Sequence, residues 1–403
     1  MTLTSTSDSS VAGMRRFVAL GACIFAITSG EFVVAGVLPQ IAGDTGVTEG
    51  RAGLVVTAYA AGMVLGGPLV SALTAHVERR RCLLALMLVA TLGNLASAAA
   101  PSLTLLLACR AATASVTSTF FARAVVTVVS EAEPGRAGAA TARLAVAMNL
   151  GLVLGSPLGA FAGHQLGWRA TFVGVGLGCL VGLALVAAAV APAAVDAPAR
   201  TIVRELAVLR SEAVAVVLLL TTVANIGVVL LFTFAAPLSR SAGLDAWALP
   251  WLLVLYGVAA TGGSAIGGIW ADRSPDKFLA TCLAALAAIG GVGGLVAESW
   301  SAVVVLVVSG AMGFAIVPGL QVRTVQAAST APTLAVALNA SGYQAAAAVA
   351  GLFGGALLDS PAPVSTVYLA SAVPALVALA ILAASVRRTR GPRPTSPRAG
   401  DSG

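Results

Sequence analysis

Twelve long apolar segments dominate the sequence and restrict the folds that are open to it. A helix needs about 20 apolar residues to cross a bilayer, and runs of about that length recur along the whole chain. Their approximate bounds are 17–39, 52–74, 82–100, 103–128, 141–163, 169–190, 213–236, 248–270, 278–297, 301–321, 334–357 and 365–386. Only 10% of the residues are charged, against about 25% in globular proteins. The sequence therefore predicts an all-α membrane protein with 12 transmembrane helices.

The distribution of basic residues predicts the orientation. Lysine and arginine accumulate in cytoplasmic segments of membrane proteins. If the N-terminus is cytoplasmic, only Arg51, Arg169 and Arg240 fall in outer loops, while Arg110 and Arg123 lie inside the fourth segment. Every other basic residue then faces the cytoplasm, where anionic lipid accounts for the net charge of +7. We therefore expect both termini to be cytoplasmic, the bilayer to be a partner of the chain, and nucleic acid not to be one.

The chain divides into two halves. The longest break between apolar segments is 191–212, which follows the sixth segment and contains Pro192 and Pro198. The expected units are a cytoplasmic N-terminal tail (1–16), a six-helix bundle (17–190), a cytoplasmic linker (191–212), a second six-helix bundle (213–386) and a disordered cytoplasmic tail (387–403).

An internal repeat supports this division. A shift of 197 residues places Tyr59 on Tyr256 and Arg80 on Lys277. As a second and separate echo, the motif at 144–149 recurs at 334–339. Parallel repeats of this kind predict two pseudo-symmetric bundles that rock about a site near the midplane.

Several function classes find no support in the residues. The five cysteines lie apart in apolar segments without CxxC spacing, and the only two histidines are distant in sequence, so no metal site is expected. The single lysine, Lys277, follows Asp276 and not a glycine, so there is no phosphate-binding GxxxxGK[ST] loop. The sequence contains no nucleophile–base pair that would indicate an enzyme and no soluble domain that would indicate a sensor. A membrane sensor or a membrane enzyme remains the alternative to a transporter.

Glu31 is the acidic residue placed nearest to mid-membrane depth. A charge there costs about 2.5–3.5 kcal/mol on insertion scales, so an intramembrane acid suggests function. A carboxyl group with alternating access to the two sides can take up a proton on one side and release it on the other. Glu31 is therefore the candidate for proton coupling and for substrate binding; the alternative is a structural acid that is hydrogen-bonded to the fourth segment.

Arg110 is the natural counter-charge for Glu31, either at a binding site or in a purely structural pair. Thr113, Thr117 and Phe121 share its helix face by their spacing. Other polar and aromatic residues inside the segments are candidates for contact with substrate or for helix–helix hydrogen bonds: Tyr59, Asn149, Asn225, Tyr256, Asn339, Tyr343 and Gln344. A pocket of this composition suits a small amphipathic molecule and suits a polyanion poorly.

Four motifs resemble one transporter family. Ser29–Ala42, with Glu31 and a Leu-Pro pair, is similar to the first helix of the chloramphenicol-type exporters in the drug:proton antiporter family of the major facilitator superfamily. Gly66–Arg81 is similar to the superfamily's loop signature, and Arg110 matches its helix-four arginine. Gly151–Gly159 (GLVLGSPLG) is similar to the antiporter signature of helix five.

The resemblance implies a bacterial inner-membrane protein that exports drugs or antibiotics, such as chloramphenicol-like compounds, by alternating access and proton antiport. The proton gradient would replace any cofactor, and the protein would be a monomer and not an enzyme. A sugar or metabolite exporter or importer of the same fold is the alternative.

The resemblance also implies a set of gating residues. Gly151, Gly155, Pro157 and Gly159 would form a hinge, or else ordinary helix packing. Arg80, Asp272 and Arg273 would form the charged loop contacts, with Ala75 standing where the first loop normally has an acid. The buried Arg123 is not part of the family pattern and has no assigned role.

Overall fold

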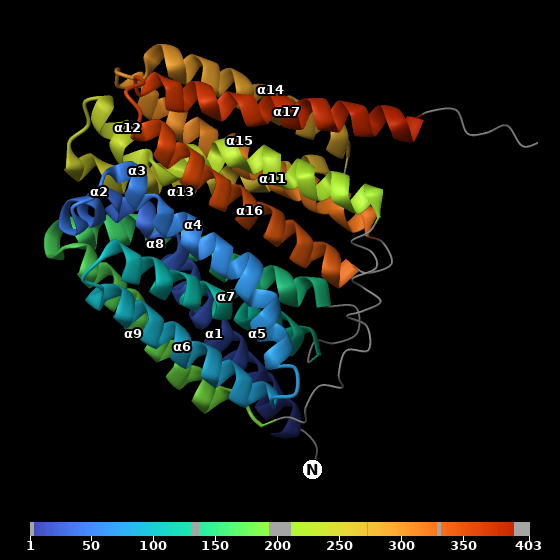
Figure 1. The fold of residues 1–403 in the computed structure, drawn as a ribbon. Helices are drawn as coiled ribbons and strands as arrows, with labels where there is room; N and C mark the ends of the chain where they lie inside the picture. The colour runs from blue at the N-terminus through green and yellow to red at the C-terminus, as the bar shows by residue number, and fades with distance from the viewer. Residues whose placement is uncertain (1–3, 131–136, 193–210, 272, 329–331, 391–403) are drawn as a thin grey trace, which may run out of the picture.

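The computed structural model describes residues 4–130, 137–192, 211–271, 273–328 and 332–390, and within these ranges it contains helices and no strands. Eleven helices are long and apolar enough to span a membrane, and a bent pair brings the number to twelve. The predicted all-helical membrane architecture is thus confirmed. The helices form two bundles, which lie one below the other in Figure 1.

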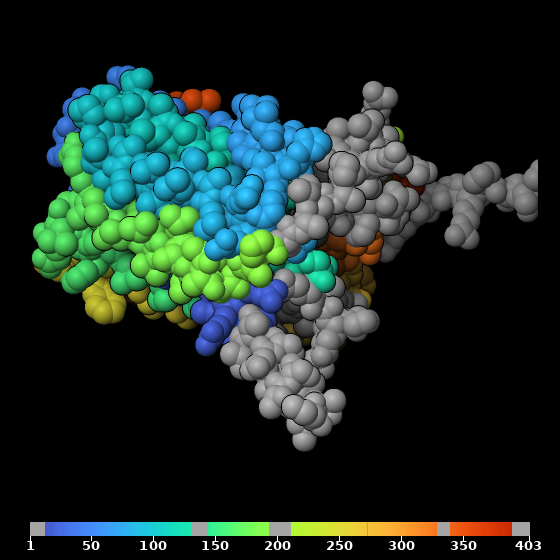
Figure 2. Space-filling model, turned by 90° about the horizontal axis from the view of Figure 1, so that it is seen from below, coloured from blue at the N-terminus to red at the C-terminus, as the bar shows by residue number. Residues whose placement is uncertain are grey.

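The first bundle comprises α1 (Thr4–Phe32), α2 (Val34–Thr45), α3 (Glu49–Ala52), α4 (Leu54–Ala61), the π-helical η1 (Gly62–Gly66), α5 (Gly67–Leu73), α6 (Arg79–Ala99), α7 (Leu103–Ser130), α8 (Ala137–Leu166) and α9 (Trp168–Ala189). The second comprises α11 (Glu212–Thr233), α12 (Ala235–Ser241), the 3-10 helix η3 (Ala246–Ala248), α13 (Leu249–Ala271), α14 (Pro275–Val296), α15 (Ser301–Ala327), α16 (Pro332–Leu358) and α17 (Ser365–Arg390). Figure 2 shows a face of the first bundle on which α6 and α9 lie side by side.

Several helix ends extend beyond the hydropathy bounds, and two of them enter the expected tails. Helix α1 begins at Thr4, inside the segment expected to be an N-terminal tail (1–16), and α17 continues to Arg390, beyond the expected end at 386. Hydropathy marks the part of a helix that lies in lipid, whereas the helical backbone hydrogen bonds can continue beyond the lipid into water, so the helices are longer than the apolar segments. Most of the expected linker (191–212) lies outside the described residues.

The first predicted span, 17–39, is not one straight helix. It breaks at Val33, and the two parts meet at 48°. Backbone hydrogen bonds cross the break from Val33 N to Ser29 O and from Gly36 N to Val33 O. Pro39, inside α2, lacks a backbone N–H and removes a further donor one turn later. The uniform hydropathy of the segment gives no sign of this break.

Side chains from two other helices hydrogen-bond to the backbone at the break. Arg110 Nη2 on α7 donates to Gly30 O at 2.8 Å, and Ser156 Oγ on α8 donates to Phe32 O at 2.9 Å. Lipid offers no donor to a carbonyl oxygen, so a broken helix needs such partners. The break therefore depends on the surrounding bundle.

A stripe of glycines on α8 follows the bent course of α1 and α2. A Cβ on Gly151 would lie 2.8 Å from Thr28 Cβ, and one on Gly155 would lie 2.6 Å from Ser29 Cα. Farther along, a Cβ on Gly159 would lie 1.9 Å from Val33 Cγ2. The stripe lets the two backbones approach closely on both sides of the break.

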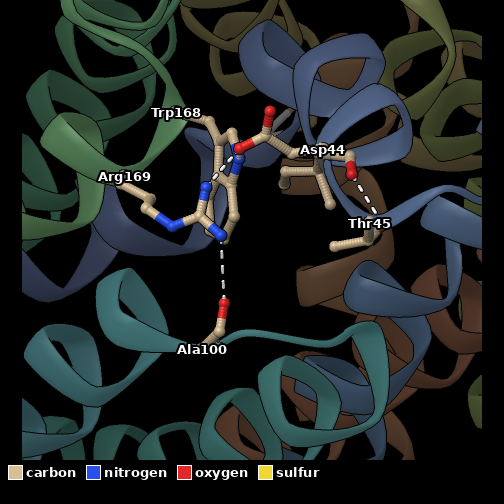
Figure 3. Close-up of polar contacts among 6 residues, drawn as sticks. Asp44, Thr45, Ala100, Trp168 and Arg169 are labelled. Atoms are coloured by element: carbon tan, nitrogen blue, oxygen red, sulfur yellow. Dashed lines mark hydrogen bonds and ion pairs between the residues drawn. The ribbon is translucent and has the colours of Figure 1, made fainter.

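The end of the molecule that carries α2, α3 and α12 is here called the far end, because α1 begins and α17 ends at the opposite, terminal end (Figure 1). At the far end Asp44 Oδ2 accepts hydrogen bonds from Trp168 Nε1 at 2.9 Å and from Arg169, and Arg169 Nη2 also donates to Ala100 O (Figure 3). This cluster joins α2, α9 and the end of α6 within the first bundle.

Contacts between the bundles also gather at the far end. Thr48 Oγ1 and the backbone N–H of Gly50 both donate to the Asp359 carboxylate, and Arg240 pairs with Glu49. Farther toward the middle, Thr57 Oγ1 donates to Ala348 O at 3.0 Å. These bonds close the far end of the space between the bundles.

We predict that Gly155→Val destabilises the protein by about 1–3 kcal/mol, because the added side chain would overlap the α1 backbone. Gly174→Val is the matched control, since a Cβ on the exposed Gly174 meets no atom within 4 Å. Thermal unfolding in detergent micelles checks both variants. Equal stability of the two variants would contradict the packing of α8 on α1.

Candidate functional site

A small cavity lies between the two bundles, near the middle of the spans. Both bundles contribute to its wall, which is formed by Glu31, Phe32, Val34, Ala35, Val56, Tyr59, Val229, Phe232, Thr233, Tyr343, Gln344 and Ala347. Four of the candidates from the sequence, Glu31, Tyr59, Tyr343 and Gln344, are thus brought together.

Glu31 provides the acidic group of the cavity. It lies in the last turn of α1, beside the break at Val33. Its Oε1 atom accepts a hydrogen bond of 2.8 Å from Gln344 Nε2 on α16 of the other bundle. The Glu31 carboxylate therefore links the first bundle to the second. The sequence analysis considered a hydrogen bond from Glu31 to the fourth span, but the hydrogen-bond partner in the structure is Gln344 on α16.

Aromatic rings form much of the remaining wall. Phe32 and Phe232 face each other across the bundles, edge to face, with ring centroids 5.8 Å apart. Tyr256 lies behind Phe232 at 5.0 Å and is itself 3% exposed, so it supports the wall without lining it. The rings give the cavity an apolar surface next to one acid and one amide.

Arg110 lies outside the cavity lining and is fully buried at 0% exposure. Its guanidinium carbon lies 4.2 Å from the ring centroid of Tyr59 and 5.3 Å from that of Phe172. Its Nη2 atom donates to Gly30 O, whereas its Nε and Nη1 atoms have no hydrogen-bond partner among the residues that the structure describes. Arg110 therefore acts on Glu31 by fixing the adjacent backbone and by its positive charge.

The remaining candidate binding residues lie elsewhere in the bundles. Thr113 Oγ1 and Asn225 Nδ2 each donate to a carbonyl of their own helix, and Asn339 Oδ1 accepts from Thr221 Oγ1 inside the second bundle. Phe121 packs in a hydrophobic cluster of the first bundle, and Asn149 is half-buried on α8. None of these five lines the cavity.

The expected gating residues lie in two places. Gly151 and Gly155 pack against α1 and Gly159 packs against Val33 at the break, with Pro157 on the same helix. At the terminal end, Arg80 Nη2 donates to Ala187 O of the first bundle. Asp272 lies outside the described residues, and the Arg273 guanidinium lies 6.0 Å from the Trp270 ring.

The structure assigns partners to two further arginines at the terminal end. Arg123 on α7 donates to Thr74 O, where α5 ends, at 2.9 Å. Arg323 on α15 pairs with Asp276 and donates to Ser385 Oγ of α17. Each arginine joins elements at the terminal end of its own bundle, so these contacts of Arg123 are structural.

Sequence reasoning missed several lining residues because apolar side chains are too common in this chain to stand out. The internal repeat could have indicated some of these residues, because positions related by the repeat line the cavity in pairs. The same shift of 197 that pairs Tyr59 with Tyr256 pairs Phe32 with Val229 and Ala35 with Phe232, and these last four all line the cavity.

Comparison with known proteins identifies relatives along the whole chain. The family model described as Major Facilitator Superfamily matches residues 20–331 and 217–402. The chain is 35% identical to a chloramphenicol resistance protein of Streptomyces lividans, over 78% of this chain and 82% of that protein. It is 32% identical to the inner membrane transport protein YdhP of Escherichia coli K12, over 92% and 95% of the two chains.

Among solved structures, a bacterial homologue of the human lysosomal transporter Spinster, in an inward-facing and unoccupied conformation, aligns with a TM-score of 0.73. It covers 96% of this chain and 99% of its own at 14% identity, so the likeness concerns the fold alone.

We predict that Ser156→Ala lowers stability by about 1 kcal/mol, since it leaves Phe32 O at the break without its side-chain donor. Ser309→Ala is the matched control, because the buried Ser309 hydroxyl bonds only to a carbonyl of its own helix turn. Chemical or thermal unfolding of both variants is the measurement. A smaller loss for Ser156→Ala than for Ser309→Ala would show that the break does not need this donor.

Proposed function

Since the chain belongs to the major facilitator superfamily, we propose that it is a proton-coupled exporter of small amphipathic organic compounds, working by alternating access. The observation that carries this proposal is the position of Glu31. The carboxylate lies in the cavity between the bundles and is hydrogen-bonded to the opposite bundle through Gln344. A proton or a substrate that binds Glu31 therefore acts on a group that both halves contact.

The lining favours neutral or cationic substrates. Glu31 is the charged side chain of the lining, and the guanidinium of Arg110 lies behind Tyr59, fully buried. An anion would meet the carboxylate without an accessible counter-charge. A molecule with an aromatic or aliphatic body and a cationic, amide or hydroxyl group can use the aromatic wall and hydrogen-bond to Glu31.

The expected orientation and one relative support export as the direction of transport. With cytoplasmic termini, as the basic loops favour, the far end faces the outside and is the closed end in this structure. The printed name of the Streptomyces lividans relative speaks of chloramphenicol resistance, and resistance by a transporter is achieved by export. Because one chain supplies the whole lining, a monomer suffices.

A proton can supply the energy for such export. One charge moving down 100 mV releases about 2.3 kcal/mol, and a tenfold pH gradient adds about 1.4 kcal/mol. One proton per cycle can thus sustain a substrate gradient of a few hundredfold. Glu31 would carry that proton from the outer to the inner aqueous side.

We predict that the purified protein in proteoliposomes accumulates a substrate against its gradient when a pH gradient is imposed, and that Glu31→Gln abolishes this accumulation. The amide keeps the shape of the side chain but cannot bind and release a proton in this pH range. The substrate panel should include chloramphenicol, lipophilic cations and sugars.

Glu298→Gln serves as the matched control, because Glu298 is an exposed acid outside the cavity. Full gradient-driven transport by Glu31→Gln would disprove the proton role of Glu31. Transport of sugars alone would replace the amphipathic substrate class by the sugar alternative.

A second prediction separates the cavity lining from the neighbouring helix interiors. Phe232→Ala should raise KM for an amphipathic substrate by about tenfold or more, because a buried phenyl ring contributes about 1.5–3 kcal/mol of apolar contact. Phe121→Ala should change KM much less, since Phe121 packs inside the first bundle. Initial transport rates over a range of substrate concentrations measure both. The reverse order of effects would place the binding site elsewhere.

A further inference from the structure

One face of α16 contacts the first bundle from the far end to the cavity. Counted inward from the far end, Asp359 accepts hydrogen bonds from Thr48 Oγ1 and Gly50 N at 2.7 and 3.2 Å. A Cβ on Gly355 would lie 2.3 Å from Gly50 O, so this crossing admits only glycine.

The same face continues toward the middle of the membrane. A Cβ on Gly351 would lie 2.5 Å from Thr57 Oγ1 and 2.9 Å from Gly53 O. One turn farther inward, Ala348 O accepts a hydrogen bond from Thr57 Oγ1. The contact positions 359, 355, 351, 348 and 344 recur at intervals of three or four, which is one face of an α-helix.

Gln344 is the innermost of these contact positions. Its Nε2 atom donates to Glu31 Oε1 at 2.8 Å, and the side chain is 7% exposed. The other contacts along the face are between neutral groups or lie at the far surface. Gln344 is therefore the point at which the row of contacts between the bundles meets the group that we propose to carry the proton.

We infer that Gln344 is a positioning residue that prevents the empty transporter from reorienting. Its hydrogen bond to the unloaded Glu31 carboxylate keeps the far end closed, and either a proton or a substrate on Glu31 weakens that bond and permits opening. This inference rests on the proposed function of Glu31.

The physical basis is the difference between a charged and a neutral acceptor. A hydrogen bond to an ionised carboxylate is roughly twice as strong as one between neutral groups. The other ionisable groups that face Glu31 are Arg110 from α7, Tyr59 from α4 and Tyr343 from α16. Tyr59 and Arg110 belong to the same bundle as Glu31 and move with it, so they do not resist separation of the bundles.

This arrangement would enforce exchange. A transporter that reorients while empty carries protons inward without substrate and dissipates the gradient. With Gln344 bound to the free carboxylate, only the protonated or substrate-loaded form reorients. The proton passes from outer water to Glu31 and from Glu31 to inner water, while substrate takes its place for the outward step.

The test uses full-length protein in proteoliposomes and measures proton influx without substrate alongside gradient-driven transport. Gln344→Met keeps the side-chain length but removes the donor. We expect substrate-free proton leak to rise by roughly tenfold or more, the scale of a lost hydrogen bond to a charged group. Gln321→Met, at an exposed glutamine on α15, is the matched control and should stay tightly coupled.

Gln344→Glu provides a second measurement that does not depend on the methionine variant folding. In its neutral form the new carboxyl group can donate to Glu31, and in its charged form it repels Glu31. Proton leak should therefore be low at acidic pH and should increase as pH rises. Tight coupling in Gln344→Met together with a flat pH profile in Gln344→Glu would overturn the inference.

The two proposals fail in different ways. If the wild-type protein shows no proton-driven transport of any compound, the proposed function itself is wrong. If the wild type couples proton and substrate and both Gln344 variants couple equally well, the proposed function stands and only the role of Gln344 is wrong.

Discussion

A helix that breaks inside a bilayer must find donors for its carbonyl oxygens within the protein, and the site depends on how this chain meets that requirement. The first span breaks at Val33, next to the carboxylate in the cavity. Arg110 binds the carbonyl on one side of the break and Ser156 binds the carbonyl on the other. The glycines of α8 give the bent segment room. Arg110, Ser156 and the α8 glycines together position the backbone at Glu31 so that its side chain lies between the bundles.

The two halves share a plan but divide the chemistry between them. The repeat places Gly227 opposite Gly30, yet α11 runs through that position without a break from Glu212 to Thr233. Where the first bundle buries Arg110 beside Gly30, the second has a very small cavity whose lining includes Gly227, Ser309 and Ser371. The first half thus supplies the titratable group. The second supplies Gln344, which hydrogen-bonds to it across the cavity.

The overall fold could be predicted from the sequence because the bilayer imposes a length and a composition on every span. The same physics explains what could not be predicted. Hydropathy is blind to the break at Val33, since both sides of it are equally apolar, and it is blind to which face of α16 meets α4. Glu31 stood out because an acid in lipid is rare. Phe232 did not stand out, because one phenylalanine in an apolar helix resembles any other.

Arg110 shows a limit of reasoning from charge alone. An arginine near an acid suggests an ion pair, but the guanidinium instead binds a backbone carbonyl between two aromatic rings. The reason lies in the broken helix, which creates a demand for donors that the sequence does not display. The resemblance to the superfamily was correct, because the motifs that carry it reflect the common fold. The partners of individual side chains could be identified only in the three-dimensional structure.

In the proposed mechanism the loading of Glu31 controls closure of the far end. This can be measured as the distance between spin labels at the exposed positions Arg51 and Ala362, which lie on opposite bundles at the far end. Pulsed electron paramagnetic resonance in lipid at several pH values gives this distance. The account predicts one short distance at high pH, and a growing population of longer distances on acidification or on addition of substrate. It also predicts that Glu31→Gln removes the dependence on pH. A distance distribution that changes with neither pH nor substrate would contradict the account.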